Sequence, residues 1–123
     1  MFTVDHDRSR RLLTVCYTGE VDAREMNQCM KEVEAATDGS ESRLRVLTDL
    51  SDLESMDEDC AKDLGAIMDL LASNDLEKVI CVIPDPTKDI GFGLMSRFHY
   101  DHRTPLVTCE SLDEAMQCLD KGG

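Results

Sequence analysis

Six acidic residues stand where predicted strands end and loops or helices begin, and carboxylates in such places could bind a metal ion or a cationic partner. They are Asp49, Asp52, Asp57, Asp85, Asp89 and Glu110. The carboxyl ends of parallel strands meet at one edge of a sheet, which would bring these side chains together. Such clusters suit Mg²⁺ or Ca²⁺, but the sequence lacks an Asp-x-Asp-x-Asp-Gly loop. Helix capping and turn formation explain most of these acids, and we predict neither a metal site nor a cofactor.

The cysteines are a second group of residues with reactive side chains. They are Cys16, Cys29, Cys60, Cys81, Cys109 and Cys118. No two are closer than nine residues apart, so the sequence has no Cys-x-x-Cys motif and no Cys/His spacing typical of a zinc site. Most of them fall in apolar strand or helix patterns, where a thiol behaves as a small hydrophobic group. We therefore predict reduced core cysteines in a cytoplasmic protein without a signal peptide.

Phe98–Arg103 is the segment richest in aromatic and imidazole side chains. Met95, Phe98, His99 and Tyr100 are candidates for lining a pocket, and a histidine there could carry a proton. Spacing alone pairs no Ser or Cys with these histidines, so nucleophilic catalysis is not indicated. The alternative is that Phe98 packs in the core while His99 and Tyr100 end a helix. We predict no catalytic residue and no enzymatic activity.

The formal net charge of −13 limits the kinds of macromolecule that this protein can bind. Nucleic acid is excluded because phosphate binding needs a basic face, and an anionic membrane surface is excluded for the same reason. No apolar run approaches the length that spans a membrane, so we predict no membrane insertion. A cationic protein partner is compatible with this charge, as is a merely solvated acidic surface.

Strand and helix patterns alternate along the chain and predict one α/β domain over residues 1–120, with 121–123 as a frayed end. The predicted strands are Phe2–Asp5, Arg11–Thr18, Leu44–Leu50, Lys78–Ile83 and Pro105–Cys109. The predicted helices begin near Asp22, at Ser55 or Asp57, near Asp89 and near Ser111. Capping boxes pair Asp22 with Glu25, Ser55 with Glu58, and Ser111 with Glu114. The order β-β-α-β-α-β-α-β-α predicts a mixed sheet of about five strands with about four helices, opened by an antiparallel hairpin.

Short motifs in this order resemble the STAS domain of anti-sigma-factor antagonists. Val46-Leu47-Thr48-Asp49-Leu50-Ser51 matches the end of the family's third strand, and Met56-Asp57 matches the apolar-Asp pair that follows it. More narrowly, the chain is similar to bacterial proteins described as STAS/SEC14-like or SpoIIAA-like. Three further segments carry that similarity, Val82–Pro86, Ile90–Gly93 and Phe98–Tyr100. The resemblance covers essentially the whole chain.

The resemblance implies a regulatory module whose surface is a polar loop between the third strand and the second helix. We predict the residues of this interaction loop as Asp49, Ser51, Asp52, Ser55, Asp57 and Glu58. In phospho-regulated STAS domains the residue after the helix-opening Asp is the phosphorylated serine. Here that residue is Glu58, which a serine kinase cannot modify and which carries a permanent charge. We therefore predict regulation without a phosphoserine switch.

The predicted function is a non-enzymatic module that binds a protein partner by surface and charge complementarity. The SEC14-like part of the resemblance implies an alternative, a module that binds a lipid or another small apolar ligand between helices and sheet. Such a pocket would be lined by methionines and one aromatic residue, Met26, Met30, Met68, Met95 and Phe98. A homodimer through the Cys- and Met-bearing helix faces stays open at this point.

Overall fold

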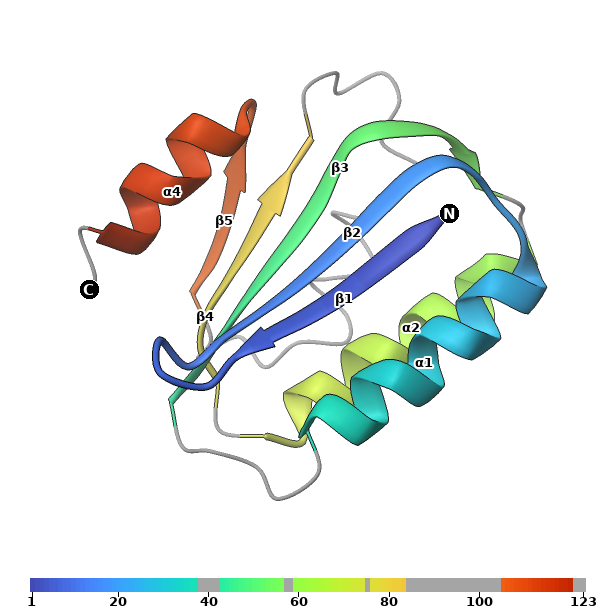
Figure 1. Cartoon of the computed structure of the whole chain (residues 1–123), viewed down its shortest axis with the longest axis horizontal. Helices are drawn as coiled ribbons and strands as arrows, with labels where there is room; N and C mark the ends of the chain where they lie inside the picture. Colours follow the sequence, from blue (N-terminus) through green and yellow to red (C-terminus); the bar gives the residue numbers. More distant parts are fainter. Residues whose placement is uncertain (38–42, 57–58, 75, 84–104, 121–123) are drawn as a thin grey trace.

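A five-stranded mixed sheet lies at the centre of the molecule (Figure 1). The computed structural model describes residues 1–37, 43–56, 59–74, 76–83 and 105–120. The strands are β1 (Phe2–Asp7), β2 (Leu12–Val21), β3 (Leu44–Met56), β4 (Leu76–Val82) and β5 (Leu106–Cys109). They lie in the order β1-β2-β3-β4-β5, with β1 antiparallel to β2 and each later neighbour parallel. The predicted mixed sheet and its opening hairpin are confirmed.

Three helices flank the sheet within the described residues, α1 (Ala23–Thr37), α2 (Cys60–Ala72) and α4 (Leu112–Asp120). The helix predicted to begin near Asp89 lies outside these residues. Crossovers that step in one direction across a parallel sheet place their helices on one face. Accordingly, α1 and α2 lie together on one face, while α4 covers the other face beside β4 and β5 (Figure 1).

The larger core fills the space between the sheet and the α1–α2 pair. Alternate residues of β2 point into it, namely Leu13, Val15 and Tyr17, all essentially fully buried. Both helices supply apolar stripes at the predicted helical spacing. From α1 these are Met26, Cys29 and Val33, and from α2 they are Cys60, Leu64, Ile67, Met68 and Leu71. Burial of this continuous apolar surface is the main stabilising term of the fold.

A smaller core lies under α4. The sheet contributes Leu12, Leu47, Ile80, Val82 and Cys109, and α4 contributes Ala115 and Leu119. No basic residue of α4 itself lies in its last turn. Instead, the guanidinium of Arg45 donates to the carbonyl of Leu119 at 3.2 Å, and Lys78 Nζ donates to that of Cys118 at 3.3 Å. Two cations from the sheet thus satisfy the helix's terminal carbonyls and complement its dipole.

The structure corrects the predicted end of the third strand. β3 does not stop at Leu50 but continues to Met56, so the stretch from Ser51 to Met56 is strand and not loop. The reason is pairing with β2, which itself runs past Gly19 to Val21. Register shifts between Cys16 and Thr18 and between Gly19 and Glu20 mark bulges in this ladder. Gly19 adopts φ +64°, a left-handed conformation that glycine takes without strain.

Two of the three predicted N-caps are observed at the beginnings of the helices, and one is not. Asp22 caps α1 as predicted, since its Oδ1 accepts the Glu25 N–H at 2.8 Å. Ser111 Oγ likewise accepts the Glu114 N–H at 3.2 Å before α4. The Ser55–Glu58 box is wrong, because Ser55 lies within β3 and α2 begins only at Cys60. Asp59, which precedes α2, makes no side-chain capping hydrogen bond.

Candidate functional site

Two strands continue at one end of the molecule where the rest of the sheet stops. In the described residues, the β3–β4 pairing ends at Asp49 and Val82, whereas the β2–β3 pairing continues to Val21 and Met56. We call Thr18–Val21 together with Ser51–Met56 the two-strand extension. It contains the part of the predicted interaction loop that the structure describes beyond Asp49. The extension therefore presents those residues on a paired ribbon with a defined direction.

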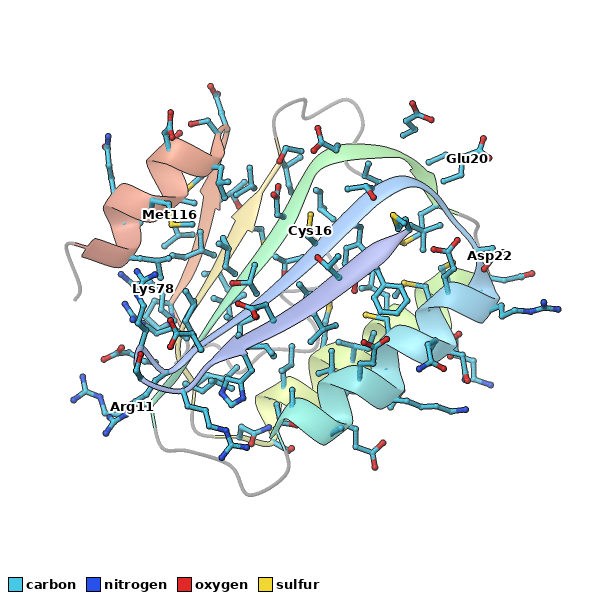
Figure 2. All side chains as sticks on the ribbon, viewed as in Figure 1. Arg11, Cys16, Glu20, Asp22, Lys78 and Met116 are labelled. Carbon is cyan, nitrogen blue, oxygen red and sulfur yellow. The ribbon has the colours of Figure 1, made fainter. Side chains whose placement is uncertain are left out.

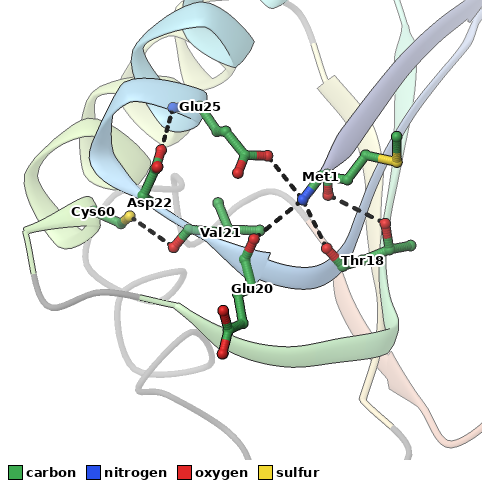
Figure 3. Close-up of polar contacts among 7 residues, drawn as sticks. All are labelled: Met1, Thr18, Glu20, Val21, Asp22, Glu25 and Cys60. Atoms are coloured by element: carbon green, nitrogen blue, oxygen red, sulfur yellow. Dashed lines mark hydrogen bonds and ion pairs between the residues drawn. The ribbon is translucent and has the colours of Figure 1, made fainter.

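Buried apolar residues hold the extension against the main core. Val21 is buried, and Leu53 and Met56 are partly buried and pack on the cluster beneath α1 and α2. The beginnings of both helices meet the extension at its far end, where Val21 pairs with Met56 (Figure 3). Asp22 caps α1, and the Cys60 thiol of α2 donates to the carbonyl of Val21 at 3.6 Å. The ribbon is thus fixed to two helix N-termini and not merely appended to the sheet.

The N-terminal residue adds to this junction. The Met1 ammonium donates to the carbonyls of Thr18 and Glu20 at 2.8 and 3.2 Å, and it lies 2.8 Å from a carboxylate oxygen of Glu25 (Figure 3). Glu25 was predicted to complete a capping box by reaching back to Asp22. Its carboxylate pairs with the ammonium instead, so only the Asp22 half of that box is observed.

Asp49 is a buried residue at the base of the extension, with 8% of its surface exposed. Its Oδ1 accepts hydrogen bonds from the backbone N–H of Ser51, at 2.9 Å, and from the Ser51 hydroxyl. Its Oδ2 accepts from the thiol of Cys16 at 3.8 Å. Burial, followed by the nearby Asp49 carboxylate, raises the pKa of Cys16. Asp49 thus fixes the backbone and side chain of Ser51 in β3. The neighbouring Cys16 thiol is kept protonated and is not activated as a nucleophile.

The outward side chains of the extension are polar and mostly acidic. Four residues of β3 are exposed, two on either side of the partly buried Leu53. They are Ser51, Asp52, Glu54 and Ser55. On β2, Glu20 is exposed, and it lies in register with Ser55. Figure 2 shows Glu20 and Asp22 at this end of the molecule, distant from Lys78 on β4 and from Met116 on α4. This end therefore offers hydrogen-bonding and negatively charged groups on a paired, core-packed backbone.

Glu20 and Glu54 were not among the predicted interaction residues. Their segments contain glycine, serine and acids, which have low strand propensity, so the sequence pattern indicated a turn and a loop. A signal was nevertheless present in the sequence. Val21, Leu53 and Met56 are spaced so that they could anchor a paired ribbon, but this is meaningful only if β2 and β3 are known to pair.

Of the remaining candidates, Glu110 is exposed directly after β5, and the others fall in parts of the chain that the structure does not describe. Asp57 and Glu58 of the interaction loop belong to this group, as do Asp85 and Asp89 of the acidic set. The predicted pocket residues Met95, Phe98, His99 and Tyr100 also lie outside the described residues. These assignments stay predictions.

The methionines proposed to line an apolar pocket are packed where they are described. Met26 and Met68 are fully buried within the main core, and Met30 packs against it.

Within residues 1–37, 43–56, 59–74, 76–83 and 105–120, no group of three or more His, Cys, Asp or Glu side chains is arranged to hold a metal ion. Among the helices described, none is long and apolar enough to cross a membrane.

The chain has the fold of SpoIIAA, as three solved structures show. An uncharacterised DUF3478-family protein from Shewanella loihica, with a SpoIIAA-like fold, matches with a TM-score of 0.70 and 15% identity over 94% of this chain and 91% of that one. The anti-sigma factor antagonist SpoIIAA in its unphosphorylated form matches with a TM-score of 0.68 and 17% identity, over 99% of this chain and 100% of that one. The phosphorylated Bacillus cell fate determinant SpoIIAA matches with a TM-score of 0.63 and 16% identity, over 95% and 97%. No family model matches the chain, and no curated protein matches it.

Proposed function

We propose that this SpoIIAA-like domain is a non-enzymatic, cytoplasmic regulatory module that binds a protein partner through the two-strand extension. Two of the structurally similar proteins are forms of SpoIIAA, one of them described as an anti-sigma factor antagonist. The observation that carries the proposal is the exposure of Ser51, Asp52, Glu54 and Ser55 on a strand held in place by Leu53 and Met56. A surface that is rigid, polar and exposed loses little conformational entropy when a partner binds.

Charge determines the kind of partner. Glu20, Asp52 and Glu54 present carboxylates on the extension, on a chain whose net charge is −13. A partner with a basic face would be attracted over a distance of about a Debye length, about 8 Å at physiological ionic strength. Such attraction acts chiefly on the association rate and on the choice of partner. Neither nucleic acid nor an anionic membrane has the required sign of charge.

A charge-matched pair of double variants tests the surface. The protein and the partner that co-purifies with it from its own cells are isolated, and association rates are measured at low and physiological salt. We expect Asp52→Asn/Glu54→Gln to slow association by about tenfold at low salt and less at high salt. Glu32→Gln/Glu34→Gln removes the same charge from exposed positions of α1 and should change the rate little. Equal effects of the two variants would show that net charge acts without a defined surface.

The proposed regulation does not use a phosphoserine at the position that follows Asp57. Glu58 occupies that place in the sequence. Ser51, one of the two described serines of the extension, donates its hydroxyl proton to Asp49, and a phosphate there would face that carboxylate. We therefore expect protein purified from its own cells to carry no phosphate on Ser51 or Ser55. Stoichiometric phosphorylation of either serine, detected by intact mass and peptide mapping, would contradict this part of the proposal.

A further inference from the structure

Two partly exposed cysteines have different surroundings, and this difference points to a second site. Cys16 and Cys118 are partly exposed, whereas the other cysteines are buried. Cys16 lies against the carboxylate of Asp49. Cys118, in α4, lies against the thiol of Cys109 at the end of β5, with the two Sγ atoms 4.0 Å apart. A thiol pair in contact can undergo chemistry that a single thiol cannot.

The fold holds this pair together at the junction of α4 with the sheet. Cys109 is completely buried in the smaller core, next to Ala115 and Leu119 of α4, the helix that carries Cys118. The carbonyl of Cys118 accepts a hydrogen bond from Lys78 Nζ, which fixes the turn of α4 that carries the second thiol. The contact is therefore made by two elements whose relative position is set independently of the sulfurs.

We propose that Cys109 and Cys118 form a dithiol site that takes a low-molecular-weight disulfide as its substrate and closes to an intramolecular disulfide. The required movement is small. A disulfide bond is about 2.05 Å long, so the sulfurs, which lie 4.0 Å apart, must approach by about 2 Å. The site lies apart from the two-strand extension and does not depend on the proposed function.

The chemistry follows thiol–disulfide exchange in two steps. The thiolate of Cys118, which is the solvent-accessible member, attacks one sulfur of the small disulfide and releases one small thiolate. Cys109 then loses its proton to solvent and attacks Cys118 Sγ, which releases the second small thiolate. The two protein thiols are oxidised by two electrons in total, and the small disulfide is reduced to two thiols. No further oxidant is needed.

The second step is expected to be the slow one near neutral pH. Burial, followed by the adjacent Cys118 thiol, raises the pKa of Cys109. Because only the thiolate attacks, closure should accelerate as the pH rises toward that pKa. The mixed disulfide on Cys118 should therefore be seen transiently at neutral pH and should be shorter-lived at alkaline pH.

The test is a redox titration of the reduced full-length protein with oxidised and reduced glutathione. Samples are quenched with acid, alkylated and analysed by intact mass. We expect a species two hydrogens lighter than the reduced protein, with neither Cys109 nor Cys118 alkylated. Cleavage after Glu110 or Glu114 separates the two cysteines and should leave their peptides joined. The proposal is overturned if both thiols remain alkylatable at every ratio, or if Cys118 only accumulates as a stable mixed disulfide.

Single variants separate this pair from the other thiols. Cys109→Ser should stop the reaction at a mixed disulfide on Cys118, and Cys118→Ser should leave Cys109 reduced. Cys16→Ser is the matched control, since it removes the other partly exposed thiol and should leave closure unchanged. Loss of closure in Cys16→Ser, or a disulfide to a different cysteine in the wild type, would also overturn the assignment. The wild-type measurement stands even if the Cys109 variant folds poorly.

Discussion

The two faces of the sheet differ in how far their apolar surface extends. Under α1 and α2 the core is continuous from β1 to β4, with Val4, Val15, Val46 and Val79 all contributing to it. On the opposite face, one cross-strand row runs through Thr3, Cys16, Asp49, Val82 and Cys109. That row is buried and apolar beneath α4 and becomes polar toward β1, where Thr3 is exposed. Among the described residues, the same sheet therefore has one face packed from β1 to β4 and one whose apolar core lies at its α4 side.

Helix length explains much of this difference. α1 has 15 residues and α2 has 13, whereas α4 has 9 and lies without a helical neighbour among the described residues. Isolated helices this short are marginal in water and depend on packing. The face under α1 and α2 is expected to unfold with the whole domain, while α4 is expected to open locally at lower cost. The proposed functions divide accordingly, with a rigid binding ribbon fixed to the first face and a redox site on the second.

Equivalent large-to-small substitutions on the two faces should separate them most strongly. Met26→Ala removes a completely buried side chain from α1 and should lower the free energy of unfolding by about 3 to 4 kcal/mol. Leu119→Ala, near the end of α4, should cost about 2 kcal/mol because the helix end can relax into the space. Urea unfolding followed by circular dichroism measures both values.

Amide hydrogen exchange shows whether the loss of stability in Leu119→Ala is confined to α4. In Leu119→Ala, amide protection should fall in α4 and stay unchanged in α1 and α2. In Met26→Ala it should fall throughout the domain. A uniform loss of protection in both variants would show that the two faces unfold as one unit, and the comparison between them would no longer hold.

Alkaline pH offers a second comparison, because Cys29 on one face and Cys109 on the other are buried thiols of raised pKa. Burial raises the pKa of Cys29, on the α1 side, from its usual 9.0 to about 11. Between these values the unfolded thiol ionises while the folded thiol does not, so the folded state binds more protons and stability falls as the pH rises. Through Cys29 alone we expect a fall of about 2 to 3 kcal/mol between about pH 8 and pH 11.

Alanine variants isolate this effect from other groups that titrate at high pH. The pH-dependent fall should be smaller in Cys29→Ala than in the wild type by the amount due to Cys29. Cys109→Ala should remove less, because α4 can open before the rest of the domain unfolds. If Cys29→Ala follows the same pH profile as the wild type in urea unfolding, the Cys29 thiol does not contribute.

The fold was largely predictable because its apolar patterns are local and strong. Val79–Ile83 is a continuous apolar run that indicates a central strand, and the stripe Leu64, Ile67, Met68 and Leu71 has the spacing of a helix. Asp22 has the position and the residue type of an N-cap. In each case the information lies within a few residues, so no knowledge of the sheet order was needed.

The conformation of the predicted interaction loop was not predictable from its sequence. Ser51–Ser55 has the composition of a loop, and its strand conformation comes from pairing with β2 through two bulges. A bulged, long-range pairing leaves no periodic signal in either segment, so tertiary context prevails over local propensity. The contact between Cys109 and Cys118 was hidden for the same reason. They lie nine positions apart in the sequence, and only the return of α4 over β5 brings the thiols together.

The smallest expected effects concern the two capping side chains, one on each face. Asp22→Ala should lower the free energy of unfolding by about 1 kcal/mol, because the Glu25 N–H loses its acceptor and α1 unfolds with the whole domain. Asp22→Asn keeps an acceptor oxygen and should lose much less. Ser111→Ala removes the longer bond, at 3.2 Å, from a helix that we expect to open locally. We expect it to lower the free energy of unfolding by about 0.5 kcal/mol in urea unfolding, and to be seen more clearly as lost amide protection in α4.

A cap contributes to global stability only when its helix unfolds with the whole domain. If Ser111→Ala lowers the free energy of unfolding as much as Asp22→Ala does, α4 is therefore as much a part of the cooperative unit as α1.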